Sequence, residues 1–142
     1  ESIEDYFEIE NPSEEQYETF RAEMDKLVEE NPLDLVLHLI SGNVAFDYGD
    51  SLVGRQSYFR YNALMDVIEA SGDGLTKETA IHVIRVTDEY TFLRSYGFNP
   101  TGQALIEHRW DEMKLAENQY GIESLYFDIS TALNSMGSLF DD

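Results

Sequence analysis

The chain has 142 residues, enough for one domain with a sizeable hydrophobic core, and its 13% aromatic content is typical of a packed globule. A formal net charge of −20 excludes nucleic acids and anionic membranes as favourable partners, because both would be repelled by such a surface. The absence of cysteine excludes disulfides, thiolate nucleophiles and cysteine-bound zinc, and no stretch is long and apolar enough for a transmembrane helix.

The N-terminal half has the apolar periodicity of three helices. Ser13 is followed three residues later by Gln16, a pattern that predicts a capping box at the start of the first helix. Asn31 stands directly before Pro32, and this pair predicts the start of a second helix. A third helix, with aromatic and apolar residues along one face, is expected over residues 54–70.

The second and third predicted helices have small and aromatic residues at the offsets of a known repeat. Gly42, Gly49, Gly54 and Tyr58 lie at these offsets, whereas Tyr61 stands where a small residue is usual. The pair therefore resembles one degenerate tetratricopeptide-type hairpin. Because a solenoid needs several stacked repeats to bury its core, we expect the rest of the chain to cover this single hairpin.

The stretch from Ser71 to Gly97 joins this helical half to a half rich in predicted strands. It opens with Ser-Gly-Asp-Gly, which predicts a tight turn formed by Asp73 between two glycines of positive φ. The β-branched run over residues 81–86 predicts a strand that is covered on both faces and hence central in the sheet. Thr87 is expected to cap a short helix that ends at Gly97.

Two further strands are predicted after this helix. Residues 103–116 alternate between two faces, with a bulge expected near Asp111 or Glu112, and residues 122–130 alternate again after a hairpin turn. The pattern of elements predicts an α+β fold, in which three N-terminal helices pack on a small, mostly antiparallel sheet with one inserted helix. We expect a single domain over residues 1–142, made of a helical half (1–70) and a hinge-plus-sheet half (71–142).

The C-terminal half also contains an ordered set of residues that carries a resemblance. Its order is Ser-Gly-Asp-Gly, Glu-x-Ala, Asp-Glu-Tyr and Tyr-Phe-Asp, from Ser71, Gly72, Asp73, Gly74, Glu78, Ala80, Asp88, Glu89, Tyr90, Tyr126, Phe127 and Asp128. By this set, the block over residues 71–130 resembles an uncharacterised family of exported Bacteroidetes proteins, domain of unknown function 4919. The resemblance implies an exported protein and supplies no catalytic residues.

Motifs for catalysis or metal binding are weak in this sequence. None of the histidines has the spacing of a zinc site, so the weak candidate for a metal is a site that uses His82 or His108 with Asp111 or Asp128. A lone histidine on a strand is more often a hydrogen-bonded structural residue. Carboxylates are so plentiful that an acid/base pair can always be imagined, which makes any given pair uninformative. No cofactor is predicted.

The sequence therefore favours a non-catalytic interaction or structural module of the cell envelope over an enzyme. The exposed aromatic candidates are Tyr48, Tyr58, Tyr61, Trp110 and Tyr120, since rigid aromatic side chains anchor partners, although a small core uses the same residues. Of these, Tyr58, Tyr61 and Trp110 are the candidate binding residues. The expected partner is a protein or peptide with a basic or neutral surface. The alternative is a carboxylate- or metal-dependent hydrolase acting on glycan or peptide.

The expected location is the periplasm or the outer membrane as a lipoprotein, with a leader that is not present in these residues. This location follows from the resemblance to exported proteins. The composition predicts no oligomeric state.

Overall fold

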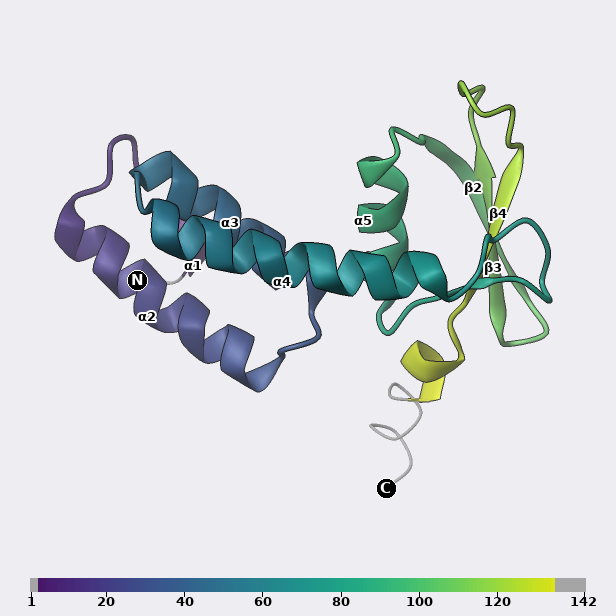
Figure 1. Cartoon of the computed structure of the whole chain (residues 1–142), viewed down its shortest axis with the longest axis horizontal. Helices are drawn as coiled ribbons and strands as arrows, with labels where there is room; N and C mark the ends of the chain where they lie inside the picture. Colours follow the sequence, from purple (N-terminus) through teal and green to yellow (C-terminus); the bar gives the residue numbers. More distant parts are fainter. Residues whose placement is uncertain (1–2, 135–142) are drawn as a thin grey trace. The chain divides into compact units, whose positions relative to one another are not determined.

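The computed structural model describes residues 3–134. The chain divides into two compact units, an N-terminal unit over Glu1–Asn62 and a C-terminal unit over Ala63–Asp142 (Figure 1). The prediction of one domain over residues 1–142 stays a prediction. The same holds for the packing of the N-terminal helices on the sheet.

The helices of the N-terminal unit are α1 (Ile3–Tyr6), α2 (Glu14–Glu30), α3 (Leu35–Tyr48) and the first part of α4 (Ser51–Ala70). The capping box predicted at α2 is confirmed. The Ser13 hydroxyl accepts from the Gln16 N–H, and the Gln16 side chain accepts from the Ser13 N–H. Helix α3 begins later than predicted, because the Asp34 side chain caps it by accepting from the N–H groups of Val36 and Leu37.

Buried aromatic and apolar side chains hold the N-terminal unit together. Its core cluster consists of Tyr17, Phe20, Met24 and Val44. The Tyr17 ring stacks on the Tyr48 ring at 4.0 Å between centroids, and its hydroxyl donates to Asp50 at 2.8 Å. This packing joins α2 to the end of α3.

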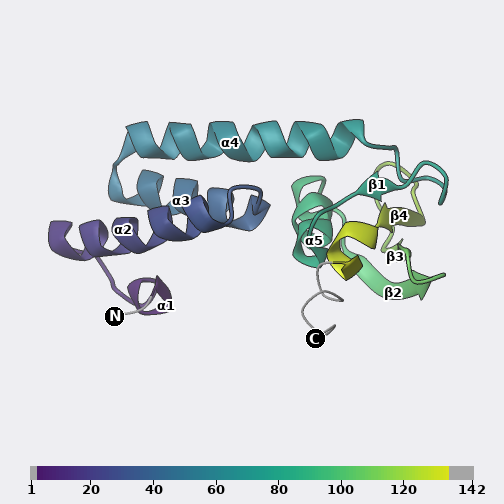
Figure 2. The ribbon, with the colours of Figure 1, turned by 90° about the horizontal axis from the view of Figure 1, so that it is seen from below.

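The C-terminal unit contains the rest of α4, then β1 (Ile81–His82), α5 (Val86–Ser95), β2 (Pro100–Ile106), β3 (Trp110–Leu115) and β4 (Ser124–Asp128). The strand order is β1-β4-β3-β2, with β1 parallel to β4 and the other two pairs antiparallel. Figure 2 shows α5 beside this sheet within the unit. The α+β class is therefore confirmed. Among the described helices, none combines the length and the apolarity that crossing a membrane requires.

The strand predicted over residues 81–86 is wrong in length and in position. Only Ile81 and His82 form a strand, and this strand lies at the edge of the sheet. Helix α5 begins at Val86, so Thr87 lies inside the helix and does not cap it. The Arg85 N–H donates to the Asp88 side chain at 3.0 Å, and this contact starts the helix earlier than the predicted cap allows.

The single strand predicted over residues 103–116 is also wrong, because this stretch is a hairpin of β2 and β3. The Arg109 N–H donates to the Ile106 carbonyl at 3.1 Å, and Glu107 and His108 between them have φ values of 52° and 54°. Two consecutive positive φ values are typical of the type I′ turn, which usually contains Asn or Gly. Because this turn contains Glu and His in place of Asn or Gly, the sequence did not indicate it.

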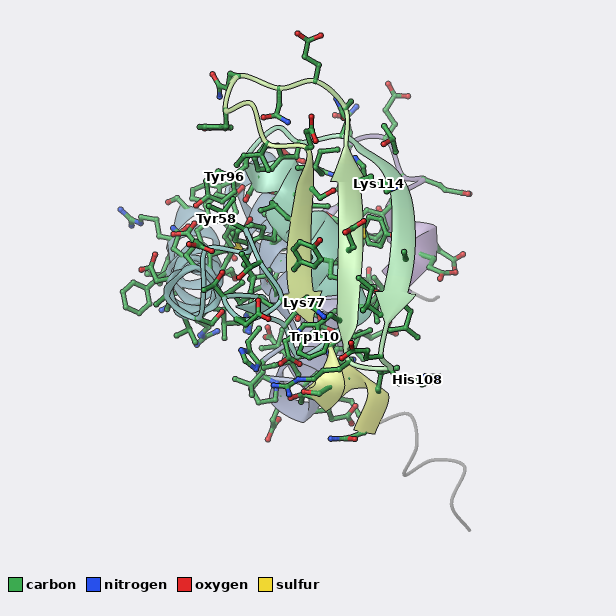
Figure 3. All side chains as sticks on the ribbon, turned by 90° about the vertical axis from the view of Figure 1, so that its right-hand side faces the viewer. Tyr58, Lys77, Tyr96, His108, Trp110 and Lys114 are labelled. Atoms are coloured by element: carbon green, nitrogen blue, oxygen red, sulfur yellow. The ribbon has the colours of Figure 1, made fainter. Side chains whose placement is uncertain are left out.

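The two faces of the sheet differ in what covers them. Asp111 pairs with Phe127 on the face toward α5, where the Phe92 ring contacts the Phe127 ring edge to face at 5.8 Å between centroids. Trp110 pairs with Asp128 on the opposite face. Figure 3 views the sheet from this second face, on which Trp110 and Lys114 are labelled. Side chains on neighbouring positions of a strand are therefore separated by the sheet.

Candidate functional site

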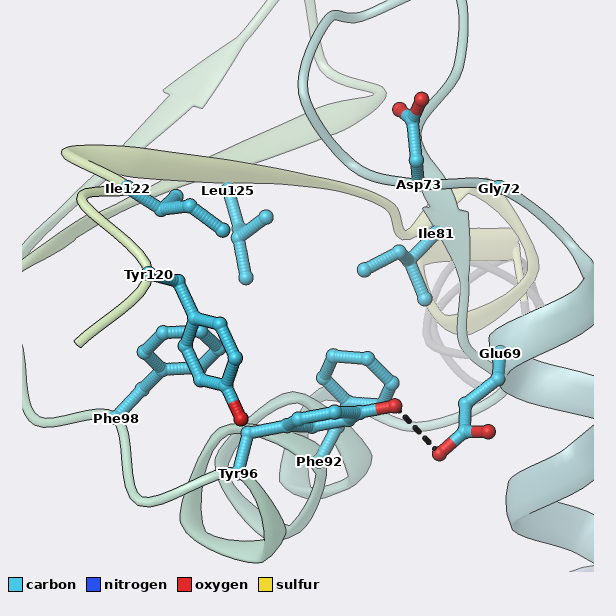
Figure 4. Close-up of a pocket in the computed structure, with 10 residues that line it drawn as sticks. All are labelled: Glu69, Gly72, Asp73, Ile81, Phe92, Tyr96, Phe98, Tyr120, Ile122 and Leu125. Carbon is cyan, nitrogen blue, oxygen red and sulfur yellow. Dashed lines mark hydrogen bonds between the residues drawn. The ribbon is translucent and has the colours of Figure 1, made fainter. Parts of the chain in front are cut away.

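A pocket of about 240 Å³ lies in the C-terminal unit (Figure 4). Aromatic and aliphatic side chains make up most of its lining, which consists of Glu69, Gly72, Asp73, Ile81, Phe92, Tyr96, Phe98, Tyr120, Ile122 and Leu125. These residues come from the end of α4, the turn after it, β1, α5 and its C-terminal turn, the loop before β4, and β4 itself. The pocket is thus formed by segments that are far apart in the sequence.

The end of α5 positions two of the rings. Gly97 has a φ of 75°, and the Phe98 N–H donates to the Leu93 carbonyl at 2.9 Å, which closes the helix as predicted. This turn places the Tyr96 and Phe98 rings 6.0 Å apart and within 26° of parallel. The left-handed conformation at Gly97 therefore aligns the two rings on one wall.

A hydrogen-bonded loop positions the third ring. The Asn118 side-chain oxygen accepts from the N–H groups of Tyr120 and Ile122, at 3.1 and 3.2 Å. The same amide donates to the Ile122 carbonyl at 2.7 Å. This loop holds the Tyr120 ring 5.5 Å from the Phe98 ring, while Tyr120 stays 53% exposed. Tyr120 therefore forms an exposed rim of the pocket.

The predicted turn at Asp73 is confirmed, with one change in the role of the glycines. The Asp73 carboxylate accepts from the Thr79 hydroxyl at 2.7 Å and from the Leu75 N–H at 2.9 Å, and these bonds hold its pKa below the usual value. Gly74 has a φ of 74°. Gly72 is needed for a different reason, because the backbone of Thr79 and Ala80 approaches it closely. The Asp73 carboxylate points away from the pocket (Figure 4).

Glu69 supplies a negative charge at one end of the Tyr96 ring. Its carboxylate accepts a hydrogen bond of 2.7 Å from the Tyr96 hydroxyl, drawn as a dashed line in Figure 4. This hydrogen bond, together with partial burial, raises the pKa of Tyr96 to about 12. The hydroxyl is therefore neutral at physiological pH and fixes the carboxylate beside the ring.

The chemistry of this lining supports binding. Among the described residues that line it there is no histidine, lysine, arginine or cysteine, so the pocket lacks the usual general bases and nucleophiles other than carboxylate and tyrosine. Apolar walls bind an apolar group by burying its surface, and aromatic faces also attract cations.

A family model described as Domain of unknown function (DUF4919) matches residues 1–138. The chain belongs to the DUF4919 family. The match includes the N-terminal unit, so it is wider than the resemblance over residues 71–130. No curated protein and no solved structure matches the chain.

The sheet face opposite α5 in this DUF4919 chain carries a second group of side chains around Trp110. Lys77 Nζ lies 5.4 Å from the centroid of the Trp110 ring, and Arg109 Cζ lies 4.8 Å from it. Asp128 Oδ2 is 3.1 Å from both Arg109 Nη2 and His82 Nε2. Arg109 is therefore paired with a carboxylate of the sheet, and Lys77 is paired with the exposed Glu107 at 3.4 Å.

Of the residues considered for a metal, His82 lies beside Asp128, whereas His108, Asp111 and Asp128 are not brought together. Asp111 and Asp128 point to opposite faces of the sheet, and His108 lies in the turn between β2 and β3. The Arg109 guanidinium also donates a hydrogen bond to the Asp128 carboxylate, and its positive charge would repel a metal ion there. Within residues 3–134, no group of three or more metal-ligating side chains is arranged to hold an ion.

Tyr58 and Tyr61, the other predicted binding residues, belong to the N-terminal unit and are half-buried. The Tyr58 ring lies against Gly42, where an added Cβ would be 2.5 Å from the ring, and its hydroxyl donates to the Asn43 side chain. Their part in binding stays a prediction. Of the rings around the pocket, sequence reasoning named Tyr120 but missed Tyr96 and Phe98, for which the signal is their position on either side of Gly97.

Proposed function

We propose that this DUF4919 chain is a non-catalytic interaction module whose main binding site is the aromatic pocket of the C-terminal unit. The observation that carries the proposal is the convergence of Tyr96, Phe98 and Tyr120 around one pocket, with Tyr120 exposed at its rim. Exposed, rigid aromatic side chains around a pocket are typical of the residues that dominate binding between proteins. Tyr58, Tyr61 and Trp110 are secondary contacts in this proposal.

The size of the pocket favours one side chain of a partner protein. Sites for small molecules usually have volumes of about 300–1,000 Å³. The pocket has a volume of about 240 Å³, which suits an anchoring side chain better than a cofactor. The net charge of −20 favours a partner with a basic or neutral surface.

For the carboxylate-dependent form of the hydrolase alternative, the structure offers one candidate pair, the carboxyl groups of Glu89 and Asp111. Burial, followed by a hydrogen bond to Asp111 and its charge, raises the pKa of Glu89 to about 9, as a general acid requires. However, Glu89 is 0% exposed and Asp111 is 2% exposed, and neither lines the pocket. A group enclosed in this way has no access to a glycan or peptide, which supports the non-catalytic function.

An exported location is part of the proposal. Its support is the resemblance of residues 71–130 to exported Bacteroidetes proteins. Fractionation of the source cells checks this location, and recovery of the protein from the cytosol alone would overturn it.

Selection from a library of displayed peptides tests the binding function. Peptides selected on the folded chain should bind a Tyr120→Ala variant at least about tenfold more weakly. Tyr90→Ala is the matched control, since Tyr90 is 38% exposed in the same unit but lies outside the lining. The proposal fails if no peptide is enriched, or if both folded variants bind the selected peptides as tightly as the wild type.

A further inference from the structure

We propose that the anchoring side chain accepted by the aromatic pocket is a lysine of the partner protein. This inference rests on the proposed function and names the chemistry of its ligand. It is drawn from three properties of the pocket, namely its aliphatic walls, its aromatic faces and a carboxylate at one end.

The aliphatic walls match the stem of a lysine side chain. Ile81 and Leu125 lie on one side of the pocket, with Ile122 beside Leu125 (Figure 4). Long cationic side chains lay their methylene groups along apolar surface and keep the charged end near polar groups. A lysine side chain therefore buries its stem against these residues.

The aromatic faces favour a positive charge over a neutral polar group. Tyr96 and Tyr120 lie on adjoining sides of the pocket in Figure 4. The Phe92 ring lies 5.0 Å from the Tyr96 ring and supports it from the side of α5. Because the face of an aromatic ring carries negative potential, an ammonium group within about 6 Å of these rings is attracted.

The Glu69 carboxylate makes the pocket favour a positively charged ligand. Its Oε1 atom holds the Tyr96 hydroxyl, and a carboxylate has further lone pairs with which to accept from an ammonium group. The Asp73 carboxylate is engaged in its own turn and points away. An anionic ligand would meet Glu69 and a net charge of −20, and no basic residue in the lining would compensate.

Neutral ligands fit this chemistry less well than a lysine does. A sugar requires several hydrogen-bond partners, whereas the side chains directed at the pocket offer the Glu69 carboxylate and two tyrosine hydroxyls. A purely apolar side chain would leave Glu69 without a partner in the ligand. A lysine uses both the walls and the carboxylate.

NMR titration of the whole chain with short peptides tests this inference. The probes are acetyl-Ala-Lys-Ala-amide, the same peptide with norleucine in place of lysine, and butylammonium. The lysine peptide should shift the ring signals of Tyr96 and Tyr120 saturably, and the norleucine peptide should bind at least about tenfold more weakly. Butylammonium should bind more weakly than the lysine peptide, because it lacks the backbone of a protein partner.

Two variants separate the role of charge from the shape of the pocket. Glu69→Gln should weaken binding of the lysine peptide by about three- to tenfold and leave the norleucine peptide unchanged. Glu78→Gln is the control, because it makes the same charge change at an exposed residue outside the lining. The chemical shifts of the Tyr96 and Tyr120 rings, measured in each variant without peptide, show whether the pocket has kept its shape.

The outcomes distinguish this inference from the proposed function. Equal binding of the lysine and norleucine peptides, or unchanged lysine binding by Glu69→Gln, overturns the choice of lysine and leaves the pocket as a binding site. Butylammonium binding as tight as that of the lysine peptide assigns the pocket to a free amine and overturns a protein side chain as its occupant. If no peptide shifts the ring signals, both the inference and the proposed function fail.

Discussion

The carboxyl groups of Glu89 in α5 and Asp111 in β3 are buried together between the helix and the sheet and interact there. Both side chains are buried, and Asp111 also accepts from the Gln103 amide at 2.5 Å. Without a proton, both Glu89 oxygens would be buried with no donor to satisfy them. Burial, then the hydrogen bond and charge of Asp111, raise the pKa of Glu89 from an ordinary 4.5 to about 9. Glu89 is therefore a neutral acid at pH 7.

The stability of the chain should fall as pH rises through the neutral range because of Glu89. The folded state keeps its proton up to about pH 9, whereas the unfolded chain loses it near pH 4.5, so unfolding releases a proton between these values. The free energy of unfolding should decrease by up to about 1.4 kcal/mol per pH unit in this window. Urea denaturation at several pH values from 5 to 9, which cover most of this window, measures how the free energy of unfolding changes with pH.

A Glu89→Gln variant isolates this contribution, because glutamine stays neutral and keeps a donor toward Asp111. Its free energy of unfolding should lose the slope and exceed that of the wild type at alkaline pH. Glu78→Gln, an exposed change of the same kind, should keep the slope. A Glu89→Gln protein with the slope of the wild type would contradict the assignment of the proton to Glu89.

Asp128 should contribute stability of the opposite pH dependence. Burial alone would raise its pKa, but hydrogen bonds from Ser130 and Arg109, with the nearby His82, outweigh burial and hold the pKa below 3.8. Its contribution is therefore present above about pH 3.8 and is lost as the pH falls through the folded pKa. Asp128→Asn should destabilise the chain by about 1–3 kcal/mol at pH 7, measured by urea denaturation.

The matched control for this variant is Asp66→Asn, an exposed change on α4. This control should leave the free energy of unfolding within about 0.5 kcal/mol of the wild type. An Asp128→Asn protein as stable as the control would show that the contacts of Asp128 with Arg109 and Ser130 contribute little.

Gly72 should tolerate no side chain, although its φ is not positive. An added Cβ would lie 2.4 Å from both the Thr79 and the Ala80 carbonyl oxygens, and neither backbone group can move without disturbing the turn. Gly72→Ala should therefore cost about 1–3 kcal/mol, seen as a lower melting temperature. Gly102→Ala is the control, because its Cβ would meet only Lys114, at 3.9 Å. Equal melting temperatures would refute the close approach at Gly72.

His108→Gly should stabilise the chain. His108 is exposed and has a φ of 54° in the turn between β2 and β3, a conformation that costs about 1 kcal/mol for a residue with a side chain. Glycine removes this cost, so the free energy of unfolding should rise by up to about 1 kcal/mol. Gln119→Gly is the control and should give no such gain, because Gln119 lies exposed in a turn but has no positive φ. A destabilised His108→Gly protein would contradict the turn geometry.

The sequence by itself determined the features that depend on neighbours within a few residues. The capping box at Ser13 and the helix end at Gly97 were confirmed, as was the Asp73 turn. These structures are formed by hydrogen bonds between residues close in the chain, so composition and spacing report them directly. The α+β class followed from the change from helical to alternating periodicity after residue 70.

Only the tertiary structure decided where the strands begin and end and what meets at the pocket. The turn at Glu107 and His108 has no Gly or Asn, and the pairing of β2 with β3 holds it in place despite the positive φ values. Ile81 forms an edge strand because its partner is Phe127 of β4, a contact that periodicity does not report. Tyr96 and Tyr120 likewise meet one pocket from separate segments, since packing between distant residues depends on the whole folded unit.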